Sequence, residues 1–264
     1  MFAGKLIAGL ICFSALGPLG LLIGLYVGHQ FDKGLGGIRP MSAQQQKQVS
    51  DSYFKTVFSL LGHLAKADGR ISAAEIALAE SLMSKMGLSG SHRKQAIELF
   101  KSGSQGAFSV EDTLHNFMAI CGRHNNLKRS LLNDLISLAI ADGELHQAEE
   151  DLLRVIAGRL GFSAALFNQF IAMIKAQSQF KHSGGGGGYQ AQTSASQLSA
   201  AYAALGVEES SSDTQIKRAY RKLISENHPD KLIGQGMPED MVKLATERTQ
   251  EIQAAYDLIV TSRK

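Results

Sequence analysis

Residues 213–231 read DTQIKRAYRKLISENHPDK, and this stretch decides how the last quarter of the chain folds. At 100° per residue, residues 213–226 form a helix with two different faces. The apolar face carries Ile216, Ala219, Tyr220 and Leu223. The opposite face, called the basic face below, carries Lys217, Arg218, Arg221 and Lys222. The pattern predicts a helix that packs on one side and presents positive charge on the other.

The residues after this helix are expected to form a loop that leads into a second, antiparallel helix. Pro229 fixes its own φ near −65° and restricts His228, so the loop displays His228 and Asp230 in a defined geometry. The second helix is predicted from about residue 239 to residue 260. Its inward positions are Ala245, Ile252, Ala255, Tyr256 and Ile259. A short helix through Leu205, with a turn at Gly206, precedes this hairpin.

The sequence YRKLISENHPDK, followed by a helix that ends in IQAAYDLI, resembles the J-domain of DnaJ-family co-chaperones over residues 198–264. The resemblance implies that His228, Pro229 and Asp230 stimulate ATP hydrolysis by a DnaK-type chaperone. It also implies that Lys217, Arg221 and Lys222, with Arg218 beside them, dock on that chaperone. The chain has neither a cysteine-rich zinc region nor a glycine-phenylalanine segment, so a general substrate-holding role is not expected.

Residues 179–197 are predicted to be a flexible linker rich in Gly, Ser and Gln. They contain five consecutive glycines, at positions 184–188, and almost no apolar residue. A random coil of this length spans on the order of 25 Å. We therefore expect the last module to swing relative to the region before it.

The middle of the chain contains an internal repeat. Residues 67–75, ADGRISAAE, match residues 141–149, ADGELHQAE, and the match extends from Leu60 against Asp134 to Ser89 against Ser163 at a shift of 74 residues. Each copy predicts a helix that ends at an Asp-Gly turn and a second helix that ends near Gly87 or Gly161. Further helical patterns lie at residues 91–102, 109–122 and 164–177. Residues 50–178 are thus expected to form an all-helical bundle.

The two Asp-Gly stretches resemble the TerB-like domain, a family in which nearby acidic residues have been proposed to bind metal. The positions implied here are Asp68, Glu75, Asp142 and Glu149. A structural role competes with this one, because Ser72 and Glu75 form a capping box at a helix start. Two acids per turn also fall short of the six to eight oxygens that calcium prefers. The spacing of Cys121 and His124 suits a metal ligand pair, but a buried thiol beside a helix-end histidine explains it without one.

Residues 6–28 predict a transmembrane helix that follows a short periplasmic N-terminus, residues 1–5. The segment has 23 uncharged, mostly apolar residues, about 34 Å as a helix. A cleaved signal peptide is the competing interpretation, but the apolar run continues well past the candidate cleavage site. Cations in the juxtamembrane segment 29–49 place the bulk of the chain in the cytoplasm. Gly20, Gly24 and Gly28 leave a groove suited to a second helix, so the anchor is expected to form a homodimer.

The net charge of +3 and the two separated cysteines exclude a strongly basic nucleic-acid binder and a disulfide framework. No phosphate-binding loop or nucleophile motif indicates an enzyme, and no cofactor is expected. The order of anchor, bundle and J-domain resembles that of the membrane-anchored DnaJ-like co-chaperones of Gram-negative inner membranes. This implies a DnaK-type partner, an unknown client and a link to envelope stress or capsule regulation. The alternative is a membrane-tethered metal-binding or scaffold protein in which the J-domain only recruits DnaK.

Overall fold

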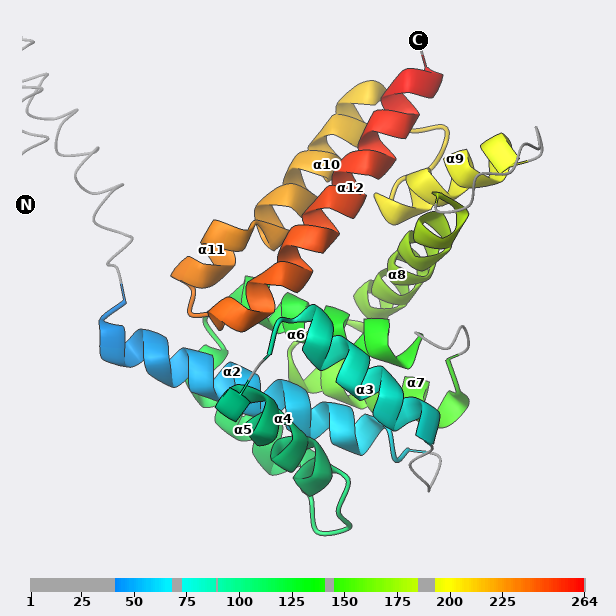
Figure 1. Ribbon diagram of the computed structural model, residues 1–264. Helices are drawn as coiled ribbons and strands as arrows, with labels where there is room; N and C mark the ends of the chain where they lie inside the picture. The colour runs from blue at the N-terminus through cyan, green and yellow to red at the C-terminus, as the bar shows by residue number, and fades with distance from the viewer. Residues whose placement is uncertain (1–40, 68–72, 89, 141–144, 185–192, 264) are drawn as a thin grey trace, which may run out of the picture. The chain divides into compact units, whose positions relative to one another are not determined.

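The computed structural model describes residues 41–67, 73–88, 90–140, 145–184 and 193–263. Residues 43–264 form one compact unit. Within the described ranges, every regular element is a helix (Figure 1), which confirms the predicted all-helical fold. None of the helices in those ranges is both long and apolar enough to cross a membrane. The predicted span at residues 6–28, with Gly20, Gly24 and Gly28, lies outside the described residues.

The bundle is built around its first helix. Its elements are α2 (Ala43–Leu64), α3 (Ala73–Lys85), α4 (Gly90–Gly103), α5 (Val110–Cys121), α6 (Asn125–Ala139), α7 (Gln147–Arg159) and α8 (Ala164–Gly184). Helix α2 contacts α4, α5 and α6, and it buries Tyr53, Phe58, Leu60 and Leu61 almost completely. Two glycines let α2 and α4 touch backbone to backbone. A Cβ on Gly62 would lie 1.9 Å from the carbonyl oxygen of Phe100, and one on Gly103 would lie 1.9 Å from that of Ser59.

The internal repeat is visible in how its second helices end. Gly87 and Gly161 have φ values of +78° and +87°, a conformation that glycine adopts without steric cost. The Leu88 amide donates to Met83 and the Phe162 amide donates to Ala157, at 3.0 and 2.9 Å. Both ends are therefore Schellman motifs, in which a left-handed glycine closes the helix. The turns with Asp68 and Asp142 lie outside the described residues.

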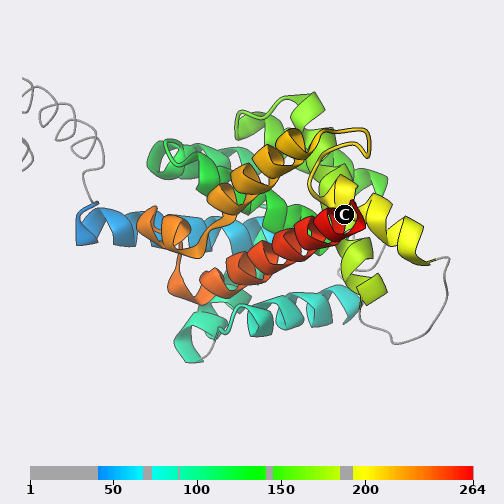
Figure 2. The same cartoon turned by 90° about the horizontal axis from the view of Figure 1, so that it is seen from above.

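The C-terminal module consists of α9 (Thr193–Ala204), α10 (Asp213–Asn227), α11 (Pro229–Gly234), a 3₁₀ turn η1 (Glu239–Met241) and α12 (Val242–Ser262). Helices α10 and α12 lie side by side as an antiparallel hairpin in both views (Figures 1 and 2). Four of the five predicted inward positions are confirmed, since Ala245, Ile252, Ala255 and Ile259 are at most 1% exposed. The fifth, Tyr256, is partly buried and packs against the core of the module. The sequence did not reveal α11, where only a loop was expected.

The described helices extend into both ends of the predicted linker, because α8 continues to Gly184 and α9 begins at Thr193. Helix α8 also takes part in the core of the C-terminal module. Ala176 is buried in the same cluster as Ala201 and Leu205, and Gln177 Nε2 donates to the carbonyl oxygen of Ala204 at 3.2 Å. The last module therefore packs directly on the end of the bundle.

Candidate functional site

Helix α10 presents the basic face because a capping box fixes its first turn and its apolar side packs against the rest of the module. Ser212 Oγ accepts from the Gln215 amide at 3.4 Å, and Gln215 Oε1 accepts from the Ser212 amide at 2.8 Å. This reciprocal capping box satisfies amides that a helix start leaves free. Ile216 is only 1% exposed, and the Tyr220 ring stacks on Tyr256 with centroids 4.2 Å apart. The rotation of the helix about its axis is thereby set.

The structure brings the four predicted cations together on the outside of α10. Lys217, Arg218, Arg221 and Lys222 are all exposed. Among the described residues, no ion pair joins any of the four to a carboxylate. Their charge is available to an acidic surface, as the sequence pattern indicates.

His228, Pro229 and Asp230 form the start of α11. Pro229 is the first helical residue, a position that its fixed φ suits and where no amide hydrogen is needed. His228 precedes it in an extended conformation, and its Nδ1 accepts a hydrogen bond from the Asp230 amide at 3.2 Å. Because Nδ1 is an acceptor, the neutral ring carries its proton on Nε2. This arrangement explains why a helix forms where a loop was expected: proline and the histidine side chain together cap it.

The two outer residues of the tripeptide are exposed, and its backbone is anchored to its surroundings. His228 and Asp230 are both exposed. The His228 carbonyl accepts from the amides of Lys231 and Leu232, each at 3.1 Å. Lys231 Nζ donates to Ser225 Oγ at 3.0 Å, which ties α11 to the last turns of α10. The histidine and aspartate side chains thus project from a fixed backbone.

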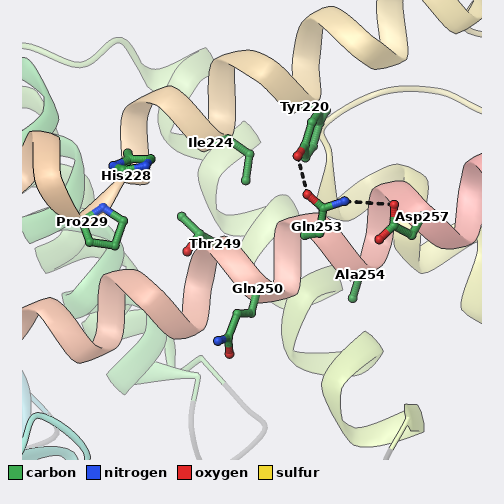
Figure 3. Close-up of a pocket in the computed structure, with 9 residues that line it drawn as sticks. All are labelled: Tyr220, Ile224, His228, Pro229, Thr249, Gln250, Gln253, Ala254 and Asp257. Atoms are coloured by element: carbon green, nitrogen blue, oxygen red, sulfur yellow. Dashed lines mark hydrogen bonds between the residues drawn. The ribbon is translucent and has the colours of Figure 1, made fainter.

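A groove of about 480 Å³ runs beside His228 between α10 and α12 (Figure 3). Tyr220, Ile224, His228 and Pro229 line one side, and residues of α12 line the other. The Tyr220 hydroxyl donates to Gln253, and Gln253 Nε2 donates to Asp257 Oδ1 at 2.9 Å. Sequence reasoning missed this groove, because its far wall comes from residues more than twenty positions away in the chain. The site therefore offers a basic helix, an exposed histidine and aspartate, and a partly apolar groove beside the histidine.

Comparisons with known proteins match each part of the chain. Residues 1–42 match the co-chaperone DjlA transmembrane domain, residues 55–172 match the tellurite resistance protein TerB, and residues 200–264 match the DnaJ domain. Co-chaperone protein DjlA of Photobacterium profundum is 39% identical over 97% of both chains. This chain belongs to the DjlA family. The DjlA of Yersinia pseudotuberculosis is 41% identical over 93% of this chain and 92% of its own, and that of Escherichia coli K12 is 39% identical over 91% and 90%. No solved structure matches.

Membership in the DjlA family confirms the resemblances drawn from the sequence. The TerB match falls within the bundle, and the DnaJ match covers the module that carries His228 and the basic face. The first 42 residues match a transmembrane domain, as the apolar run predicts.

Of the four metal candidates in the bundle, the structure describes the side chain of one, Glu149. Asp68, Asp142 and the side chain of Glu75 lie outside the described residues. Glu149 Oε2 accepts from the His146 amide at 3.1 Å at the start of α7, which is a capping role. In the part of the chain that the structure describes, no three His, Cys, Asp or Glu side chains gather as metal ligands would.

Cys121 is fully buried. Burial raises the pKa of its thiol to about 11, and burial also lowers the pKa of His124. Both shifts fit a buried thiol beside a histidine at the start of α6.

Proposed function

We propose that this chain is a membrane-anchored co-chaperone that binds a DnaK-type chaperone through the basic face and stimulates its ATP hydrolysis through His228, Pro229 and Asp230. The observation that carries the proposal is the capped tripeptide, with His228 and Asp230 exposed, on a DnaJ domain whose four exposed cations form no ion pair among the described residues. Catalysis stays with the partner, so this chain itself is not an enzyme.

Docking is electrostatic in the first step. Four exposed cations on two turns of α10 produce a concentrated positive surface, which steers association with an acidic partner and fixes its orientation. His228 Nε2 then donates, and the Asp230 carboxylate accepts, hydrogen bonds at the partner. These bonds favour the partner's hydrolysis-competent state, which is a shift in population.

The N-terminal anchor bears on where in the cell the co-chaperone acts. The match of residues 1–42 to the DjlA transmembrane domain supports an inner-membrane protein. Lys33, Arg39 and Lys47 follow the apolar run and favour a periplasmic N-terminus with the bundle and J-domain in the cytoplasm. Gly20, Gly24 and Gly28 support a homodimer through the anchor. In this setting the co-chaperone would act on clients linked to envelope stress or capsule regulation.

The test is single-turnover ATP hydrolysis by the host DnaK with the full chain in lipid nanodiscs. The His228→Gln variant is expected to lose stimulation while keeping its overall fold, because the side chain is exposed and its hydrogen bond caps the six-residue α11 rather than a core helix. His115→Gln makes the same change at an exposed histidine of α5 and should stimulate like the wild type. If His228→Gln also stimulates like the wild type, the site assignment is wrong. If the wild type binds DnaK without stimulating it, the chain is a recruiting scaffold instead.

A further inference from the structure

A buried ion pair joins the J-domain to the bundle. Arg248 Nη2 of α12 lies 2.7 Å from Asp134 Oδ1 of α6, and the two side chains are only 10% and 2% exposed. The Tyr53 hydroxyl of α2 donates to Asp134 Oδ2 at 3.0 Å. Asn133 faces the same guanidinium, and with its side-chain oxygen toward Arg248 it accepts from Nη1 at 3.1 Å. Both charges are thus removed from water and satisfied across the contact.

The internal repeat shows that this carboxylate is unusual for its position. Asp134 aligns with Leu60 of the first copy, and Leu60 is fully buried in the bundle core. Leucine at such a position needs no partner, whereas a buried carboxylate is strongly unfavourable unless a cation and hydrogen bonds compensate it. Burial raises the pKa of Asp134, and Arg248 opposes that shift. Among the described residues, the cation that faces Asp134 comes from the J-domain.

Weaker contacts surround the buried pair and involve one end of the J-domain. Arg129 Nη1 of α6 lies 2.9 Å from Glu226 Oε2 of α10, and His92 Nδ1 of α4 lies 2.5 Å from Asp240 Oδ2 of η1. The backbone at Gly236 approaches α2 so closely that a Cβ would lie 2.7 Å from Val49 Cγ1. The basic face, His228 and Asp230 remain exposed in this arrangement.

We propose that the bundle is an intramolecular docking partner of the J-domain, in which Asp134 and Asn133 form a guanidinium-binding site for Arg248 and Tyr53 holds the Asp134 carboxylate in place. The docked J-domain keeps the basic face and His228 accessible, so the module is held in position and does not swing freely on its linker. The occupant is the J-domain of the same chain, because α8 and α9 pack directly on each other and Gln177 bonds to Ala204. This docking does not depend on the proposed action on DnaK.

Crosslinking in the full chain tests the docking. Because the side chains of His92 and Asp240 touch across the contact, cysteines at these two positions should be joined within one chain by a short bismaleimide. The background carries Cys12→Ser, and Cys121 is buried. The exposed pair of His92 and Asp240 contributes little to the stability of the docked state, so replacing both residues with cysteine should leave docking in place. Adding Arg248→Glu should lower the yield of the intramolecular crosslink on the order of tenfold or more, because two buried negative charges would then face each other.

Lys243→Glu is the matched control, because it makes the same charge change on α12 at an exposed position. Its crosslink yield should equal that of the parent. If Arg248→Glu gave the same crosslink yield as the parent, the proposal would be overturned. A crosslink that joins two chains would also overturn it.

A second variant separates docking from folding. Asp134→Leu places the residue of the first repeat copy in the second, so the bundle should stay folded, with a helical circular dichroism spectrum and a cooperative melt, while the crosslink is lost. A wild-type crosslink yield in Asp134→Leu would also refute the proposed site.

Discussion

The close approach of α2 and α4 makes Gly62 sensitive to a single added methyl group. Its Cβ would lie 1.9 Å from a carbonyl oxygen and 2.7 Å from the carbonyl carbon of Phe100. Ordinary contacts between such atoms exceed 3 Å, and both sides are backbone, so the helices must separate. Forced overpacking of this kind costs about 3 kcal/mol, at the upper end of the usual range. The gain in helix propensity from Gly to Ala offsets about 1 kcal/mol of this.

The expected net loss for Gly62→Ala is therefore about 2 kcal/mol, which in a unit of this size lowers Tm by about 4–8 °C. Gly158→Ala is the matched control, since it lies within α7 and its Cβ would meet nothing within 4 Å. That variant should raise the free energy of unfolding by about 0.5–1 kcal/mol. Thermal unfolding of the full chain in nanodiscs, followed by circular dichroism at 222 nm, measures both. A Tm for Gly62→Ala at or above that of the wild type would refute the backbone contact between α2 and α4.

Three further predictions follow from the site and the core. Arg221→Glu should weaken DnaK binding on the order of tenfold at low salt and less at high salt, as measured by titration calorimetry. Lys243→Glu is the control and should bind DnaK like the wild type. If Arg221→Glu also bound like the wild type at low salt, the role of the basic face would be contradicted. Ser212→Ala should lower the stability of the J-domain by about 1 kcal/mol in denaturant unfolding, and no change would mean that the cap of α10 is unimportant. Since burial raises the pKa of Cys121 from 9.0 to about 11, the folded state holds its thiol proton more tightly than the unfolded state. Stability should therefore fall as pH rises from 9 to 11, and Cys121→Ala should flatten that fall.

The sequence predicted those parts of the fold that depend on local pattern. The two faces of α10, the inward stripe of α12 and the helix ends at Gly87 and Gly161 all follow from periodicity and from the conformational freedom of glycine. The exposed positions of the basic face and of His228 follow in the same way. In each case the deciding residues lie within a few turns of one another.

What the sequence could not provide were pairings between distant segments. Arg248 and Asp134 are 114 residues apart, and neither looks unusual on its own helix. The repeat did offer one signal, because Asp134 replaces a leucine. The α11 helix was missed for a different reason: its cap comes from His228, a residue that is rare at helix starts, although the proline after it favours the first helical position.

The cap at His228 has a thermodynamic consequence for recognition. Its imidazole acceptor, its carbonyl and the rigid ring of Pro229 fix the backbone of the tripeptide before any partner arrives. The loss of conformational entropy that a flexible loop would suffer on binding is thus already incurred when the chain folds. A variant that weakens the cap would consequently bind with a larger entropic penalty even where its side-chain contacts are retained, and this difference would appear in the temperature dependence of its affinity.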